Sequence, residues 1–152
     1  MCASRFSEQN KTSYRPTNKD CLMRIVTTPN FCKVCLEGLW LSLLKRVDLI
    51  DNIHGGCQWE GTWKKTLDLR LVPLADFREI PVDVKESFSI SWTKDGEVLD
   101  AFTNQTSIIL EDGDAVGRYV VDVKFGTEEV RVDREELLTA RAGYIVDKTC
   151  TK

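Results

Sequence analysis

The chain has 152 residues, of which 42% are hydrophobic, and a formal net charge of -3, so it can bury one good core with a small appendage. The charge is too mild, and the lysines and arginines too scattered, for the basic surface that nucleic acid requires, so we expect no nucleic-acid partner. The longest apolar stretch, over residues 38–44, is too short to span a bilayer, and we expect no membrane partner either.

The first half of the chain predicts an arm and a helix. Residues 1–20 are rich in Ser, Thr, Asn and Lys, and we expect a polar arm with little structure of its own. From Val34 to Val47 the apolar positions recur at helical spacing, which predicts an amphipathic helix over about residues 32–48. Gly55 and Gly56 then suggest a boundary, with residues 1–56 as the first unit and residues 57–152 as the second.

Beyond Cys57 the hydrophobic period changes to two residues, which is typical of half-buried strands. Turn signals such as Lys94-Asp95-Gly96 separate these strands. The fold class is therefore mainly β, an antiparallel β-sandwich preceded by a short helical segment. The predicted strands cover residues 66–72, 88–92, 98–102, 107–110, 118–125, 128–132 and 144–146.

Three residues make the sandwich prediction more specific. Trp92 stands in a strand just before a turn, as the core tryptophan of strand C does in immunoglobulin-like domains. Tyr119 stands where such domains place a corner tyrosine, and Val121 occupies the place of the second core cysteine. We expect an immunoglobulin-like sandwich whose core packs on Trp92 without the usual inter-sheet disulfide; any other antiparallel sandwich with a buried Trp is the alternative.

The six cysteines indicate a cellular compartment. An even number in a short chain is typical of a disulfide framework formed in an oxidising environment, so we expect a secreted or extracellular protein. Met1 is followed by polar residues, however, and this chain shows no signal peptide. A mature or truncated piece of a secreted protein and a cytosolic protein with reduced thiols are both compatible with this sequence, and we favour the first.

Structural disulfides are the use of the cysteines that we rank first. Cys57 and Cys150 bracket the predicted sandwich and would tie its ends together. Cys21 would pair with Cys32 or Cys35, which leaves Cys2 and one other thiol unassigned. A redox pair at Cys32 and Cys35 is a weaker alternative. A zinc site of Cys21, Cys32, Cys35 and Cys57 is another, although structural zinc sites usually contain two close cysteine pairs and this chain has one.

Part of the chain resembles a known family. The order Tyr14-Arg15-Pro16, Cys21-Leu22-Met23-Arg24 and Phe31-Cys32-Lys33-Val34-Cys35, followed by a helix, resembles a segment of the IgA-peptidase-like zinc metallopeptidases of the metzincin clan. The resemblance covers about residues 14–50. It implies that Cys21, Met23 and Arg24 belong to a Met-turn that lies beneath the catalytic zinc without binding it. It also implies that the supporting helix continues into a β-sandwich accessory domain.

The zinc-binding segment of that family is missing from this chain. Metzincins hold zinc through H-E-x-x-H and a third ligand, whereas this chain has the single histidine His54 and no such helix. We therefore expect no catalytic residue, no metal ligand and no cofactor here, zinc being expected only in a longer family member. The chain alone would be inactive as a peptidase.

Two functions follow from these expectations. The first is a non-catalytic C-terminal portion of an IgA-peptidase-like metallopeptidase that positions or binds a protein substrate. The alternative is a stand-alone immunoglobulin-like module that binds a protein or a glycan. The apolar side chains between Leu36 and Leu44 also predict that the helix either mediates self-association or packs against the sandwich.

Overall fold

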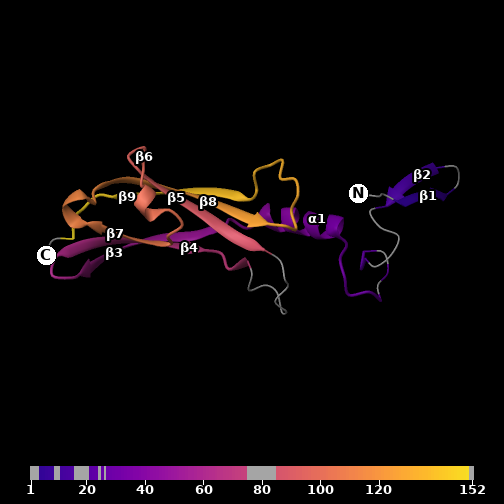
Figure 1. Ribbon diagram of the computed structural model, residues 1–152, viewed down its shortest axis with the longest axis horizontal. Coiled ribbons are helices and arrows are strands. Elements are labelled where there is room, and N and C mark those ends of the chain that lie inside the picture. The colour runs from indigo at the N-terminus through magenta and orange to yellow at the C-terminus, as the bar shows by residue number, and fades with distance from the viewer. Residues whose placement is uncertain are drawn as a thin grey trace.

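The computed structural model describes residues 21–23, 25, 27–74 and 85–150, together with the backbone of residues 4–8 and 11–15. The fold is mainly β, as the sequence predicted, with two facing antiparallel sheets that form two layers (Figure 1). One sheet has the order β3-β4-β7 and the other the order β6-β5-β8-β9. The first sheet comprises β3 (Ile50–Trp59), β4 (Trp63–Leu71) and β7 (Ser107–Glu111). The second comprises β5 (Glu86–Lys94), β6 (Glu97–Val98), β8 (Gly117–Thr127) and β9 (Thr139–Val146).

The main core lies between these two sheets. Alternate residues of β8 point inward and are buried, as expected for a strand with one solvated face. Leu67 and Ile108 of the first sheet, and Trp92, Tyr119 and Val121 of the second, are all fully buried. Trp92 and Val121 are paired on neighbouring strands, and the Trp92 indole N–H donates to the Gln105 carbonyl oxygen at 2.9 Å. The polar atom of the largest core side chain is therefore satisfied.

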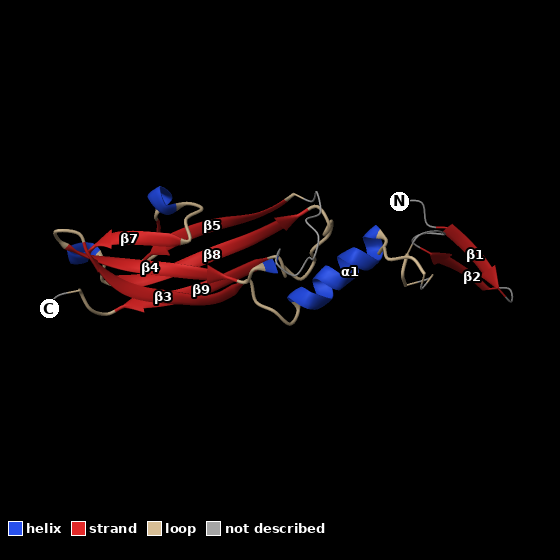
Figure 2. Ribbon diagram, turned by 90° about the horizontal axis from the view of Figure 1, so that it is seen from below, coloured by secondary structure: helices blue, strands red, loops and turns tan. Residues whose placement is uncertain are grey.

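A second core forms where α1 (Lys33–Leu44) meets one end of the sandwich. Figure 2 shows α1 between the sandwich and the hairpin of β1 (Ser4–Glu8) and β2 (Lys11–Arg15). Trp40 and Leu44 are the buried residues of the helix, and the Trp40 ring lies 5.6 Å from that of Phe125. This hairpin forms where the sequence predicted an unstructured arm, and its strand Lys11–Arg15 contains Thr12 and Tyr14, residue types that favour strands.

Polar contacts join α1 to the loop between β8 and β9. The Glu37 carboxylate accepts backbone N–H groups of Arg131 and Val132 at 2.8 and 3.1 Å and pairs with the Arg131 guanidinium. The Trp40 indole N–H donates to Glu129 at 2.5 Å. The helix is thus attached to the sandwich by apolar packing and by charge-assisted hydrogen bonds.

The predicted boundary after Gly56 is wrong because it falls inside β3. The two glycines are needed for close packing rather than for a flexible linker. A Cβ atom at Gly55 would lie 2.1 Å from the Tyr144 hydroxyl, and one at Gly56 would lie 2.7 Å from the Thr66 hydroxyl. Glycine in a strand often marks such a close approach.

Two further predictions about elements need correction. Residues 128–132 form a turn rather than a strand, because Val130 turns inward to the core beneath α1. The helix is shorter than predicted and ends at Leu44. Its apolar side chains also lie on more than one side, since Leu39 and Leu43 are exposed while Trp40 and Leu44 are buried.

The Cys57–Cys150 disulfide is confirmed, with the two Cα atoms 5.8 Å apart and a separation of 93 positions in sequence. It joins β3 to the segment that follows β9, at the end of the sandwich opposite α1 (Figure 1). Within the described residues, no helix has the length and apolar character needed to cross a membrane.

Candidate functional site

The segment that resembles a Met-turn forms a compact backbone turn before α1. The Ile25 N–H donates to the Cys21 carbonyl at 2.9 Å, and the Leu22 N–H donates to the Asn30 carbonyl at 2.7 Å. The Met23 side chain is 73% exposed. Arg24 lies outside the described residues. The turn therefore presents Met23 to solvent instead of burying it against this chain.

Three cysteines fix this turn to the start of the helix. The Sγ atoms of Cys21, Cys32 and Cys35 all lie within 4.8 Å of one another, and the Cys21 and Cys35 sulfurs are 3.5 Å apart. None of the three is in a disulfide. Cys21 is buried, and its sulfur accepts the Cys32 backbone N–H at 3.4 Å. The structure thus brings Cys21 close to Cys32 and Cys35, as the sequence predicted, but without the predicted disulfide between them.

The thiols differ in acidity for local reasons. The backbone N–H of Cys32 lowers the pKa of the Cys21 thiol, because a donor stabilises the thiolate. Contacts with the thiols of Cys32 and Cys21 raise the pKa of Cys35 to about 12. The pKa of the Cys21 thiol is thus lowered and that of the Cys35 thiol is raised from the ordinary thiol value.

A groove, separate from the cysteine cluster, lies on the outer face of the sheet formed by β5, β8 and β9. It has a volume of about 730 Å³ and is lined mainly by polar side chains, among them Ser89, Ser91, Asp122 and Arg141. These residues alternate with the buried core positions of the same strands, so they necessarily point away from the core.

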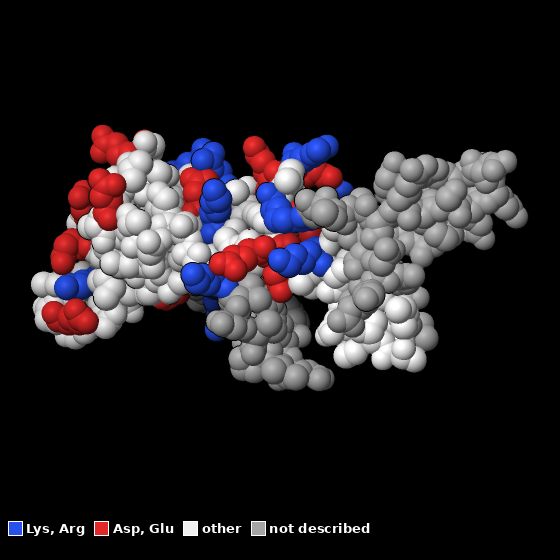
Figure 3. All heavy atoms as spheres, turned by 45° about the vertical axis from the view of Figure 1, so that its right-hand side comes forward, with Lys and Arg blue, Asp and Glu red and all other residues white. Residues whose placement is uncertain are grey.

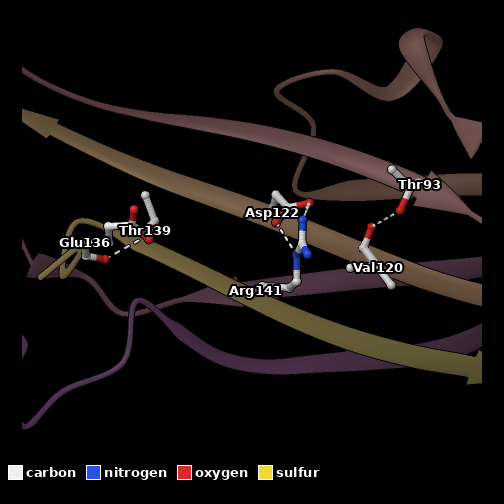
Figure 4. Close-up of polar contacts among 6 residues, drawn as sticks. All are labelled: Thr93, Val120, Asp122, Glu136, Thr139 and Arg141. Atoms are coloured by element: carbon white, nitrogen blue, oxygen red, sulfur yellow. Dashed lines mark hydrogen bonds and ion pairs between the residues drawn. The ribbon is translucent and has the colours of Figure 1, made fainter. Parts of the chain in front are cut away.

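The centre of this groove is an ion pair across neighbouring strands. Arg141 donates to the two carboxylate oxygens of Asp122, from Nε at 2.6 Å and from Nη2 at 3.0 Å (Figure 4). The Asp122 carboxylate raises the pKa of Arg141, so the guanidinium stays charged. At one end, the Thr139 hydroxyl donates to the Glu136 carbonyl at 2.8 Å. The remaining N–H groups of Arg141 and the hydroxyls of Ser89 and Ser91, which line the same groove, can bind polar ligands through hydrogen bonds.

The surface around these features carries charges of both signs. On the side of the molecule drawn in Figure 3, lysines and arginines lie among aspartates and glutamates over the middle of the surface. Such a surface favours short-range, geometrically specific contacts over long-range electrostatic attraction.

The described residues do not bring together the histidine and carboxylate ligands that a catalytic zinc ion of this family needs. His54 lies in β3, is exposed, and belongs to no group of metal-ligating side chains there. The cysteine cluster is the one group of at least three such side chains within the described ranges. The zinc site of four cysteines considered from the sequence cannot form with Cys57, because Cys57 is bonded to Cys150. Cys2 lies outside the described residues.

Sequence reasoning missed the residues of the groove. The alternation of residues 118–125 does place Asp122 on the solvent face, which was the available signal. Arg141 had no such signal in the sequence. Ala140, Ala142 and Gly143 beside it are weak strand formers, so the sequence predicted only residues 144–146 of β9 as a strand.

Comparison with models of known protein families, with curated proteins and with solved structures finds no match to this chain.

Proposed function

We propose that the chain is a non-catalytic C-terminal portion of an IgA-peptidase-like metallopeptidase, in which the Met-turn and α1 support a catalytic domain and the β-sandwich positions a protein substrate. The observation that carries this proposal is the exposure of apolar side chains on the turn and on α1. Met23 and Phe31 beside the turn, and Leu39 and Leu43 on α1, are exposed although they are large and hydrophobic. A Met-turn that supports a zinc site needs such a surface for contact with the rest of that site.

The sandwich fits the accessory domain of this proposal. If β3, β4, β5, β6, β7, β8 and β9 are lettered A, B, C, C′, E, F and G, the sheets have the orders A-B-E and C′-C-F-G. Immunoglobulin-like sandwiches divide their strands in a closely related way. The Tyr119 hydroxyl donates to the Ala115 carbonyl at 2.9 Å, as a corner tyrosine does. Both features support an immunoglobulin-like type.

The proposal has a direct test in the coding sequence and in the protein. We expect H-E-x-x-H within a domain's length upstream of Met1. In a protein extended to include that segment, we expect Met23 to be oxidised by peroxide much more slowly than in the 152-residue chain, because the catalytic domain covers it. An upstream frame without the motif, or equal oxidation rates, would contradict the proposal.

A second candidate function is a stand-alone immunoglobulin-like module that binds a protein or a glycan. The groove around Asp122 and Arg141 favours it, since polar side chains converge there on a concave surface. In that case, Arg141→Ala should abolish binding to a captured ligand, while Arg118→Ala, which changes an exposed arginine of the same sheet outside the groove, should leave it intact. Equal binding by both variants would argue against the groove.

A further inference from the structure

We propose that Cys21, Cys32 and Cys35 bind one Zn²⁺ ion as thiolates, and that this ion holds the Met-turn against the amino end of α1. The site is structural and separate from any catalytic zinc. It assigns a metal to a chain for which the sequence predicted none. The zinc site weighed from the sequence included Cys57 as a fourth ligand, and it ranked below disulfides because the chain has only one close cysteine pair.

The spacing of the sulfurs is that of a metal site. Zinc–sulfur bonds of about 2.3 Å in a tetrahedron place neighbouring sulfurs about 3.8 Å apart. The Cys21 and Cys35 sulfurs are 3.5 Å apart, and all three lie within 4.8 Å of one another. Small side-chain rotations suffice to place all three around one cation. Zinc prefers soft thiolate ligands, and each thiol releases its proton to solvent on binding.

The number of thiols also favours a metal over a disulfide. A disulfide between any two of them would leave the third thiol packed against it without a covalent partner. A single zinc ion uses all three. Among the described residues no fourth His, Cys, Asp or Glu joins the group, so water can complete the tetrahedron.

The surroundings suit a cluster with net negative charge. Three thiolates and Zn²⁺ carry one negative charge, and the positive end of the α1 dipole lies at Cys32. The helix has no side-chain hydrogen bond at its N-cap and no acidic residue in its first turn. The Cys32 N–H already points at the Cys21 sulfur, at 3.4 Å, and such bonds stabilise coordinated thiolates.

The test is the zinc content of the purified protein after dialysis against zinc-free buffer. We expect one zinc per chain, and less than about 0.1 in Cys21→Ser, Cys32→Ser and Cys35→Ser, because loss of one of three thiolates removes most of the affinity. A double variant, Cys57→Ser with Cys150→Ser, is the matched control, since it removes two cysteines outside the cluster and should keep the zinc.

Cobalt supplies a second measurement that does not depend on folding of a variant. Co²⁺ added to the metal-free protein should produce thiolate-to-cobalt charge-transfer absorption that saturates at one equivalent and disappears when one equivalent of zinc is added. Protein with no zinc and no cobalt band, or a peptide map that finds Cys21 in a disulfide with Cys32 or Cys35, would overturn the proposal. Neither result would affect the upstream-sequence test of the proposed function.

Discussion

At the scale of single residues, the sandwich depends on polar atoms that are paired inside the core. The Trp92 indole and the Tyr119 hydroxyl each donate to a backbone carbonyl of a connecting segment, Gln105 and Ala115 respectively. Among the described residues, no buried side-chain nitrogen or oxygen lacks a hydrogen-bond partner. These two bonds join the connecting segments to the sheet. Breaking either bond would leave a carbonyl without a donor, and a buried carbonyl in that state lowers stability.

Tyr119→Phe tests the contribution of one such bond. The substitution keeps the ring but leaves the Ala115 carbonyl without its donor, so we expect a loss of about 1–3 kcal/mol in the free energy of unfolding. Urea denaturation measures this loss. Tyr144→Phe is the matched control, because Tyr144 is only half-buried, and it should change stability by less than about 0.5 kcal/mol. Equal losses in the two variants would show that the bond contributes nothing specific.

Alkaline pH provides a second test of Tyr119. Burial raises the pKa of Tyr119 from 10.0 to about 12. The unfolded chain therefore releases this proton first as pH rises, and stability that is full below pH 10 should fall between pH 10 and 12. Denaturation midpoints measured across this range should fall less steeply for Tyr119→Phe than for the unchanged protein. Parallel curves would show that Tyr119 is not the group responsible.

At the scale of elements, the attachment of α1 to the sandwich is the joint on which the candidate site depends. Trp40 and Leu44 supply its apolar contact, and Glu37 supplies its polar one. The long range of these contacts explains why the sequence did not reveal them, since Glu37 and Arg131 are 94 positions apart. Helical spacing did predict that a helix exists, but not which of its sides is covered.

Glu37→Gln tests this joint. The Arg131 guanidinium and the backbone N–H groups of Arg131 and Val132 lower the pKa of Glu37. Loss of the charge should weaken the contact by about 1–2 kcal/mol, since hydrogen bonds to charged groups are the stronger class. Hydrogen exchange of the α1 amides should become faster, while β8 stays protected. Glu128→Gln, in the same loop and exposed, should leave α1 unchanged.

The same joint has a predictable dependence on acid. A depressed pKa means that Glu37 contributes stability above the unfolded carboxyl value of 4.5, and that this contribution disappears as pH falls through the lower folded value. We expect the protection of the α1 amides, measured against their intrinsic exchange rates, to fall below pH 4.5 in the unchanged protein and to be less sensitive to pH in Glu37→Gln. Identical pH profiles would contradict this role.

How much of each element could be predicted depended on local pattern. β8 and the Lys94-Asp95-Gly96 turn carry strong local signals, and Asp95 and Gly96 do adopt the positive φ of 50° and 94° that such a turn requires. β3 was missed because Gly55 and Gly56 resemble a linker until Tyr144 is placed against them. The sequence placed Cys21 with Cys32 and Cys35, either in a disulfide or in a four-cysteine zinc site, but a cluster of three free thiols depends on how the turn folds back onto α1.

At the scale of the whole molecule, the two ends are held differently. The end that contains Cys57 and Cys150 is closed by a covalent bond between cysteines 93 positions apart in sequence. Replacement of both cysteines by serine should lower the free energy of unfolding by about 2–5 kcal/mol, mainly by releasing the unfolded chain. Thermal unfolding with and without reductant measures the effect. A variant whose midpoint is unchanged, and still responds to reductant, would contradict this assignment.

The other end of the sandwich is followed by α1 and the turn, which expose apolar side chains, and no disulfide joins the described cysteines there. Leu39 and Leu43 are 47% and 38% exposed on adjacent turns of α1, and Met23 and Phe31 extend the apolar surface toward the turn. A surface of this kind, when left uncovered, favours association between copies of the chain. We expect the 152-residue chain to form dimers or larger species at high concentration in light scattering, and Leu39→Glu with Leu43→Glu to remain monomeric. Val98→Glu, which adds a charge on the distant strand β6, should associate like the unchanged protein. A monomeric unchanged chain would show that this end is stable in water, and would remove the main structural reason for expecting a catalytic domain to cover it.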